Sequence, residues 1–221
     1  MPTNKKKVSV QARQKEIPKK SKKGLVIGLS AVGAVALVLI VVFAIVLPIM
    51  NRPNARPQIE IDIQDYGVIT LELDRSQAPA TVDNFTKLVR EGFYDGITLH
   101  RIMDGFMMQG GDPQGTGAGG SSVKIKGEFS SNGVNNTISH KRGTISMARS
   151  GNDNNSASSQ FFIVHQDSTF LDGDYAAFGH VLSGMEVVDA ICQDSLQYVI
   201  DSNGTIPAEY QPIIKSIKIL E

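Results

Sequence analysis

Two short stretches of the chain alternate apolar and polar side chains. They are IEIDI at residues 59–63 and ITLEL at residues 69–73, with the turn-forming residues Asp65, Tyr66 and Gly67 between them. Successive side chains of a strand point to opposite faces of a sheet. The pattern therefore predicts a β-hairpin that packs one face against a core and leaves the other face in water.

The apolar spacing then changes to that of a helix. Apolar residues recur at helical spacing from Val82 to Val89, behind Pro79, which suits the first turn of a helix, and Gly92 suits its end. A second helix is predicted over residues 184–193.

Four further segments have the composition of short strands between turn-rich loops. They are residues 143–148, 159–165, 175–182 and 212–221. Many short strands with only two helices predict a mainly β domain, either a barrel or a sandwich. A sheet that closes into a barrel has no free edges, and two helices could cover its open ends.

Residues 25–50, LVIGLSAVGAVALVLIVVFAIVLPIM, form a run of 26 residues without a charge. About 20 apolar residues suffice to cross a bilayer, whereas the apolar core of a secretory signal is usually about 7–15 residues long. The run is therefore predicted to be a transmembrane signal anchor that is not removed. A cleaved signal peptide and a buried core helix are the alternatives.

The segment before the apolar run is strongly basic. Residues 1–24 contain nine Lys or Arg against one Glu, whereas residues 25–221 contain 13 basic against 21 acidic residues. Positively charged flanks stay on the cytoplasmic side and are attracted to anionic lipids. We therefore expect a single-pass protein of the cell membrane with a cytoplasmic N-terminus. A linker at residues 51–57 would connect the span to an extracellular domain at residues 58–221, and a domain that faces the cytoplasm is the alternative.

Composition excludes several classes of function. A neutral to acidic body lacks the basic face of a nucleic-acid-binding protein, so no nucleic-acid partner is expected. The single cysteine, Cys192, excludes an internal disulfide and stands at an apolar helical position, where a buried thiol is expected. His140, His165 and His180 lack the close spacing of metal ligands. We therefore expect no metal and no other cofactor.

A cation stands beside an apolar run in LHRIMDGFMMQ, residues 99–109. Arg101 precedes Phe106, Met107 and Met108, and the stretch contains no obvious nucleophile or general base. In isolation, such an arginine is more often a surface residue that lies over apolar neighbours. The wider sequence therefore has to decide its role.

Eight pieces of the chain occur in an order that resembles the cyclophilins, the cyclosporin-binding family of peptidyl-prolyl cis-trans isomerases. They are FYDG (93–96), HR (100–101), GFMMQGGD (105–112), GTG (115–117), SMA (146–148), SQFF (159–162), LDG (171–173) and FG (178–179). One such piece is weak, but eight in sequence are specific. The resemblance covers about residues 58–221 and leaves out the basic head and the apolar run.

The resemblance implies both a fold and a reaction. The fold is a closed barrel of eight antiparallel strands capped by two α-helices, here preceded by one transmembrane helix. The reaction is rotation about the peptide bond before proline, whose uncatalysed barrier is about 18–20 kcal/mol because the nitrogen lone pair is shared with the carbonyl. A donor aimed at the proline nitrogen stabilises the twisted bond more than the planar one, without a nucleophile, a base or a cofactor.

The same resemblance assigns roles to individual residues. Arg101 corresponds to the catalytic arginine, and Gln109 to the glutamine that binds the substrate backbone and helps to orient that arginine. The substrate-binding positions are Phe106, Met107, Phe162 and Leu171 in the proline pocket, Ala148 and Arg149 along the peptide backbone, Gly115 in the neighbouring groove wall, Phe170 as an aromatic wall and Tyr175 at the pocket rim. His100 is expected to point inward as a structural residue.

Three positions depart from the best-known members of the family. Phe170 stands where they have tryptophan, Tyr175 where they have histidine, and Arg149 where they have asparagine. Loss of the indole N–H is expected to weaken cyclosporin binding without removing the activity, and the charge of Arg149 could bias sequence preference. Many bacterial members carry the phenylalanine and the tyrosine, which indicates a bacterial source. Together with the anchor predicted at residues 25–50, this indicates a bacterial, membrane-anchored form.

We therefore expect a monomeric catalytic domain that isomerises X-Pro bonds in exported, proline-containing polypeptides near the membrane. A docking module for proline peptides and an envelope scaffold are the alternatives. The presence of Arg101 and Gln109 favours catalysis, because binding a ground-state proline would not require the arginine. Residues 194–212 have no functional interpretation at this stage.

Overall fold

The computed structural model describes residues 56–220, and the predicted transmembrane segment at residues 25–50 lies outside them. The described residues belong to one compact unit. None of the helices within residues 56–220 has the length and apolar character that crossing a membrane requires.

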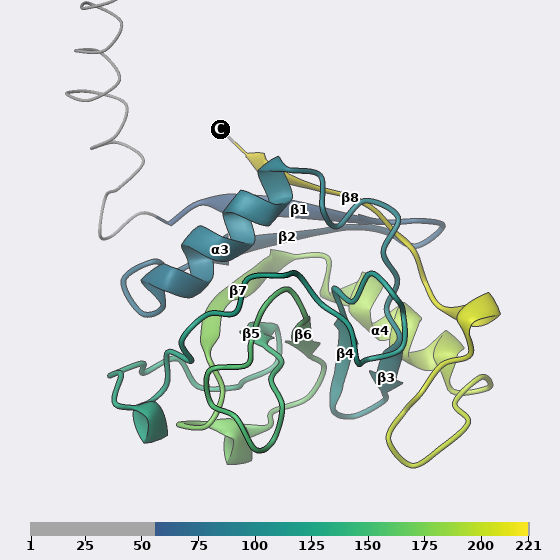
Figure 1. The fold of residues 1–221 in the computed structure, drawn as a ribbon. Coiled ribbons are helices and arrows are strands. Elements are labelled where there is room, and N and C mark those ends of the chain that lie inside the picture. The colour runs from purple at the N-terminus through teal and green to yellow at the C-terminus, as the bar shows by residue number, and fades with distance from the viewer. Residues whose placement is uncertain (1–55, 221) are drawn as a thin grey trace, which may run out of the picture. The chain divides into compact units, whose positions relative to one another are not determined.

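Eight antiparallel strands form one strongly curled sheet, with two α-helices packed against it (Figure 1). The strands are β1 (Gln58–Ile63), β2 (Gly67–Leu73), β3 (Arg101–Met103), β4 (Met107–Gly110), β5 (Thr144–Met147), β6 (Phe161–Val164), β7 (Ala177–Ser183) and β8 (Ile214–Leu220). The α-helices are α3 (Pro79–Arg90) and α4 (Met185–Ser195), and the short 3-10 helices are η2 (Ser130–Asn132), η3 (Thr169–Leu171) and η4 (Ala208–Tyr210). The mainly β prediction with two helices is confirmed, as are the six strands and the two helices expected from the pattern.

The predicted closed barrel is not confirmed. The strand order is β3-β4-β6-β5-β7-β2-β1-β8, so β3 and β8 are the two ends of the sheet. Only isolated bridges connect these ends, between Thr98 and Ile213 and between Arg101 and Thr205. The chain before β8 contains Pro207 and Pro212, which lack the N–H that a regular ladder requires. The sheet is therefore a half-barrel.

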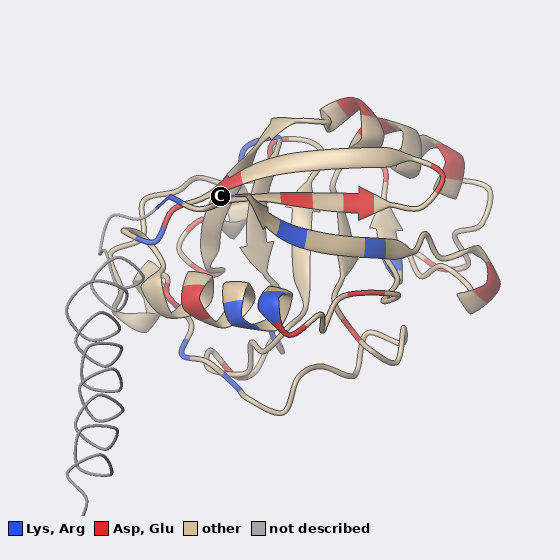
Figure 2. Ribbon diagram, turned by 90° about the horizontal axis from the view of Figure 1, so that it is seen from above, with Lys and Arg blue, Asp and Glu red and all other residues tan. Residues whose placement is uncertain are grey.

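The hairpin of β1 and β2 follows the alternation of its sequence. The isoleucines of β1 are buried while its acidic residues remain partly accessible to water. On the outer surface, Glu60 of β1 lies opposite Lys218 of β8, and Asp62 pairs with Lys215 at 3.1 Å. Figure 2 shows these charges as red bands on one strand beside blue bands on the next. The acidic residues of β1 on the outer face of the sheet thus lie next to the lysines of β8.

A distant carboxylate caps helix α3. The residue before the helix, Ala78, has no side chain that can cap it. Instead, the buried Glu128 accepts hydrogen bonds from the backbone N–H groups of Ala80 and Thr81 at 3.0 and 2.8 Å, and from the Thr81 hydroxyl at 2.7 Å. These donors have no partner within the helix. These hydrogen bonds thereby fix the long loop that carries Glu128 to the first turn of α3.

Cys192 on α4 is buried, as predicted. Burial raises the pKa of its thiol to about 12. The reactive species of a cysteine is the thiolate, so this thiol is unreactive near neutral pH.

Strands β4 and β6 are buried on both faces, unlike β1. Met108, Phe161 and Ile163 face the main core inside the curl. Their neighbours Met107 and Phe162 belong to a second, smaller apolar cluster on the other face. Continuous apolar runs such as FMM and FFIV are typical of strands covered on both sides. Alternation alone does not predict β4 for this reason.

Candidate active site

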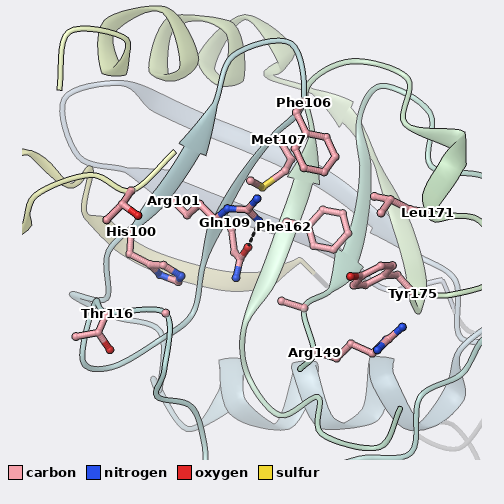
Figure 3. Close-up of a pocket in the computed structure, with 13 residues that line it drawn as sticks. His100, Arg101, Phe106, Met107, Gln109, Thr116, Arg149, Phe162, Leu171 and Tyr175 are labelled. Atoms are coloured by element: carbon pink, nitrogen blue, oxygen red, sulfur yellow. Dashed lines mark hydrogen bonds between the residues drawn. The ribbon is translucent and has the colours of Figure 1, made fainter. Parts of the chain in front are cut away.

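A cavity of about 240 Å³ opens on the face of the sheet that carries the second apolar cluster (Figure 3). Residues from the strands β3, β4 and β6, from the 3-10 helix η3 and from the adjoining loops line it: His100, Arg101, Phe106, Met107, Gln109, Thr116, Gly117, Ala148, Arg149, Phe162, Leu171, Tyr175 and Thr205. One side of the cavity is apolar and the other carries the hydrogen-bonding groups. This division suits a ligand with an apolar ring next to a polar backbone.

Three hydrogen bonds hold the guanidinium of Arg101 at the polar side of the cavity. Nε donates to the backbone oxygen of Asn203 at 2.6 Å, and Nη1 donates to Oε1 of Gln109 at 3.1 Å (Figure 3). Nη2 lies 3.3 Å from the sulfur of Met103. A guanidinium carries five N–H donors, so others remain for a ligand. The group is fixed before any ligand arrives.

Burial lowers the pKa of Arg101 from its ordinary value, and the electrostatic interactions with Tyr175 and Asp201 act in the opposite direction. An ordinary arginine titrates far above neutral pH, so the guanidinium remains a cation under working conditions. Partial removal from water strengthens its interaction with any charge that develops in the cavity.

A chain of amides extends the polar side. Nε2 of Gln109 donates to Oε1 of Gln160 at 2.8 Å, and Nε2 of Gln160 donates to the backbone oxygens of Gly117 and Gly119 at 3.0 and 2.7 Å. Because each amide nitrogen is occupied as a donor, Oε1 of Gln109 is directed at Arg101. The glycine-rich loop thus contributes to the orientation of the arginine through two glutamines.

Phe162 of β6 forms the floor of the apolar side, between Met107 of the neighbouring strand β4 and Leu171 of η3 (Figure 3). Phe106 packs against the same cluster. These side chains come from three segments that the sheet brings together, and together they form a shallow apolar cup beside the cation.

His100 is buried, as predicted, with 3% of its surface exposed. Burial lowers the pKa of His100, so its ring is neutral near pH 7. Neither ring nitrogen has a hydrogen-bond partner within the described part of the chain. Its ring lies beside Gly117, whose position leaves no more than van der Waals space for a side chain. The residue supports the loop at the cavity edge.

Comparison with known proteins shows the family of the chain that forms this cavity. The family model described as "Cyclophilin type peptidyl-prolyl cis-trans isomerase/CLD" matches residues 58–219. The chain belongs to the cyclophilin-type peptidyl-prolyl cis-trans isomerases. The match covers most of the segment that carries the sequence resemblance, and the activity of this family is the cis-trans isomerisation of peptidyl-prolyl bonds.

Relatives of this cyclophilin domain carry the same activity in their names. Peptidyl-prolyl cis-trans isomerase B of Bacillus subtilis is 47% identical over 124 residues, which cover 56% of this chain and 82% of that protein. The peptidyl-prolyl cis-trans isomerase of Helicobacter pylori strain 26695 is 44% identical over 141 residues, 62% of this chain and 83% of that protein. A solved cyclophilin-type isomerase of Cryptosporidium parvum superposes with a TM-score of 0.65 at 31% identity, covering 76% of this chain and 99% of that one. That isomerase was also solved in the presence of the dipeptide Ala-Pro.

Most of the residues predicted for the cyclophilin site lie in the cavity. Those that line it are Arg101, Phe106, Met107, Gln109, Ala148, Arg149, Phe162, Leu171 and Tyr175. The guanidinium carbon of Arg149 lies 4.8 Å from the centre of the Tyr175 ring and 5.4 Å from that of Phe129. Arg149 also donates to the backbone oxygens of Asp174, Ser150 and Gly151. These contacts hold the guanidinium of Arg149 at the rim of the cavity.

Phe170 does not line the cavity. Its side chain is 72% exposed and lies on the outer side of Phe106, with 5.6 Å between ring centres. In the tight turn of η3, Leu171 points into the cluster and its neighbour Phe170 points away from it. The role of Phe170 as an aromatic wall for the substrate therefore stays a prediction, and in this structure the residue contacts the pocket side chain Phe106.

Gly115 also lies outside the cavity. A side chain at this position would come within 2.8 Å of Oε1 of Gln211 and 3.2 Å of the Thr98 hydroxyl. The small size of Gly115 thus allows close packing against the chain before β8, and its role in the groove wall stays a prediction. Thr116 and Gly117 occupy the expected place in the cavity wall.

The sequence analysis missed the turn at residues 201–205. Asp201 accepts hydrogen bonds from the backbone N–H groups of Asn203 and Thr205, and from the Thr205 hydroxyl. The turn presents the Asn203 oxygen to Arg101 and places Thr205 in the cavity wall. The sequence DSNGT is a recognisable turn signal, but only the fold shows that it faces an arginine a hundred residues away.

Gly204→Ala is expected to lower kcat/KM by roughly tenfold, because the turn is what holds Nε of Arg101. Gly204 has φ +80°, and a Cβ there would lie 2.4 Å from Met103 Cγ and 2.6 Å from the Ile102 oxygen. The turn must therefore move away from β3. Gly133→Ala is the matched control, because Gly133 has a similar φ of +77° and open space around it. Isomerase kinetics and thermal melts of both variants check this expectation, and equal activity in the two would contradict it.

Proposed function

We propose that the cyclophilin domain accelerates X-Pro isomerisation by directing Arg101 at the twisted prolyl amide. The observation that carries this proposal is the triple anchorage of Arg101 by Asn203, Gln109 and Met103 at the edge of an apolar cup. The proline ring sits in the cup formed by Phe106, Met107, Phe162 and Leu171. This places the bond that rotates beside the cation.

Rotation removes the amide resonance and returns a lone pair to the proline nitrogen. The planar bond does not offer this lone pair, so a donor aimed at the nitrogen stabilises the transition state more than the substrate. Because the donor is already fixed, its orientation costs nothing during the reaction. Gln109 orients the arginine through its oxygen, and the second N–H of its amide, which does not bond Gln160, donates to the peptide backbone.

We further propose that the domain is tethered to the cell membrane and acts on exported, proline-containing polypeptides as a monomer. The support is the uncharged run at residues 25–50 behind a basic head at residues 1–24. A tether raises the local concentration of the enzyme near chains that emerge from the membrane. In this arrangement the catalytic domain faces outward.

Cysteine labelling in intact bacterial cells tests this topology. A Ser122→Cys variant of the full chain should react with a membrane-impermeant maleimide in intact cells, whereas Ser9→Cys should react only after lysis. The native Cys192 is buried and contributes little background. Labelling of Ser9→Cys in intact cells would show that the orientation is the opposite of the proposed one. Recovery of a shortened protein in the medium would show that the signal is cleaved.

The alternative role is a docking module that binds proline peptides at the membrane without turnover. The full chain in detergent separates the two roles by the isomerisation rate of an X-Pro test peptide, which exchanges in tens to hundreds of seconds without a catalyst. An enzyme-dependent acceleration supports catalysis. Peptide binding without acceleration would make the cavity a docking site.

A further inference from the structure

A buried polar cluster lies directly behind the apolar side of the cavity. Its members are His140, Ser146 of β5 and Asp172, which follows η3. The side chains of His140 and Ser146 are fully buried, whereas Asp172 is about one-third exposed at its outer edge. The sequence analysis gave none of the three a role.

The hydrogen bonds of the cluster indicate the protonation states of the His140 ring and the Asp172 carboxyl group. The backbone N–H and Nδ1 of His140 lie 2.7 and 2.8 Å from Oδ1 of Asp172, and the Ser139 hydroxyl donates to Oδ2 at 2.6 Å. Burial lowers the pKa of His140, although Asp172 partly offsets this effect. Burial would raise the pKa of Asp172, but the hydrogen bonds from Ser139 and His140 outweigh it and lower the pKa. A neutral ring therefore donates from Nδ1 to a carboxylate.

The other ring nitrogen of His140 then acts as an acceptor. Nε2 lies 3.0 Å from the hydroxyl of Ser146, which donates to it. The order serine, histidine, aspartate is that of a hydrolytic triad. No part of Ser146 is exposed, however, so no substrate carbonyl can reach it. The arrangement is not a nucleophilic site.

Its contacts instead connect it to the cavity wall. The His140 ring stacks on Phe162 with 6.0 Å between centres and 17° between planes, and its edge faces Tyr175 at 6.5 Å. Asp172 directly follows Leu171 in the chain. The imidazole of His140 thus joins the strand that carries Phe162 to the segment that carries Leu171 and Tyr175. These three side chains lie on one side of the cavity (Figure 3).

We propose that His140 and Asp172 are positioning residues for the proline pocket: they fix the spacing between Phe162 and Leu171 and thereby set the affinity for the proline ring. This inference rests on the proposed function, since it assumes that the ring binds between these side chains. The ring is held in the substrate and in the transition state alike, so a looser wall raises KM and leaves kcat nearly unchanged.

Two substitutions at Asp172 separate positioning from mere stability. Asp172→Ala removes the acceptor of His140 and is expected to raise KM for an X-Pro peptide at least fivefold, with kcat changed less than twofold. Asp172→Asn keeps one oxygen for His140 and can donate to the Ser139 hydroxyl, so it should restore KM to within twofold of the wild type.

Asp167→Ala is the matched control. Asp167 joins the same two segments, accepting from the backbone N–H of Arg142 and from Lys141 at 2.9 Å each. It has none of the cluster's contacts with the cavity wall, so its loss should leave KM within twofold of the wild type. Thermal melts of all variants report the loss of stability separately from KM.

An unchanged KM in folded Asp172→Ala would overturn the proposal. If that variant does not fold, Ser146→Ala in the full chain decides: it removes the donor to His140, should raise KM at least threefold, and an unchanged KM would again overturn the proposal. An inactive wild type would instead contradict the proposed function, so the two failures are distinguishable.

Discussion

Arg101→Ala is expected to lower kcat/KM by about a hundredfold, which corresponds to about 2.7 kcal/mol of transition-state stabilisation. The reason is that the variant loses the only fixed cation beside the apolar cup among residues 56–220, apart from Arg149 at the opposite rim. Arg101→Lys should restore little activity, because an ammonium cannot bond Asn203, Gln109 and the substrate in a fixed plane. Peptide isomerisation kinetics with the full chain measure both variants.

Arg90→Ala provides the control for the loss of an arginine. Arg90 lies exposed in the last turn of α3, and it does not line the cavity. Its replacement should leave kcat/KM unchanged. If folded Arg101→Ala kept more than a tenth of the wild-type activity, the cation would not be the main source of catalysis, and desolvation of the bond in the apolar cup would have to account for the rate.

Phe85→Ala is expected to destabilise the domain by about 3–5 kcal/mol, a large part of the about 5–15 kcal/mol that a domain of ordinary size has. Phe85 is fully buried on α3, and its ring lies 5.0 Å from Tyr94, 5.5 Å from Phe161 and 5.3 Å from Phe178. Its removal leaves a cavity where α3 covers the curled sheet. Urea unfolding of the full chain, followed by near-UV circular dichroism, measures the difference in the free energy of unfolding.

Phe170→Ala makes the same chemical change at an exposed position. With 72% of its side chain in water, Phe170 should contribute less than about 0.5 kcal/mol. Equal destabilisation by the two variants would show that the ring cluster around Phe85 does not hold the domain together. A modest rise in KM for Phe170→Ala would fit its position behind Phe106.

Local physical rules predicted the regular elements. Alternation predicted β1 and β2 because one face of each is wet, and the spacing behind Pro79 predicted α3 because one face of the helix is dry. The same rules do not predict β4, since both of its faces are covered and no alternation remains. Its second face is covered by the side chains of the second apolar cluster, and β4 contributes Met107 and Gln109 to the cavity.

The sequence motifs named most of the residues of the candidate site, and the fold shows how these residues are held. The resemblance to the cyclophilins predicted Arg101, Gln109 and the apolar side chains as site residues, and the fold brings them together in one cavity. Phe170 and Gly115 do not line that cavity: Leu171 is the buried residue of η3, and Gly115 lies against Gln211 and Thr98.

By itself, the sequence determined the class of fold, the family, the reaction and the residue types that the reaction needs, because periodicity and motif order are properties of the chain. Only the tertiary structure decided which groups hold those residues: the Asn203 oxygen on Arg101, the Glu128 cap on α3 and the His140–Asp172 pair behind Phe162. It also decided that the sheet remains a half-barrel. Each of these is a contact between distant parts of the chain, and its geometry exists only once the sheet has curled.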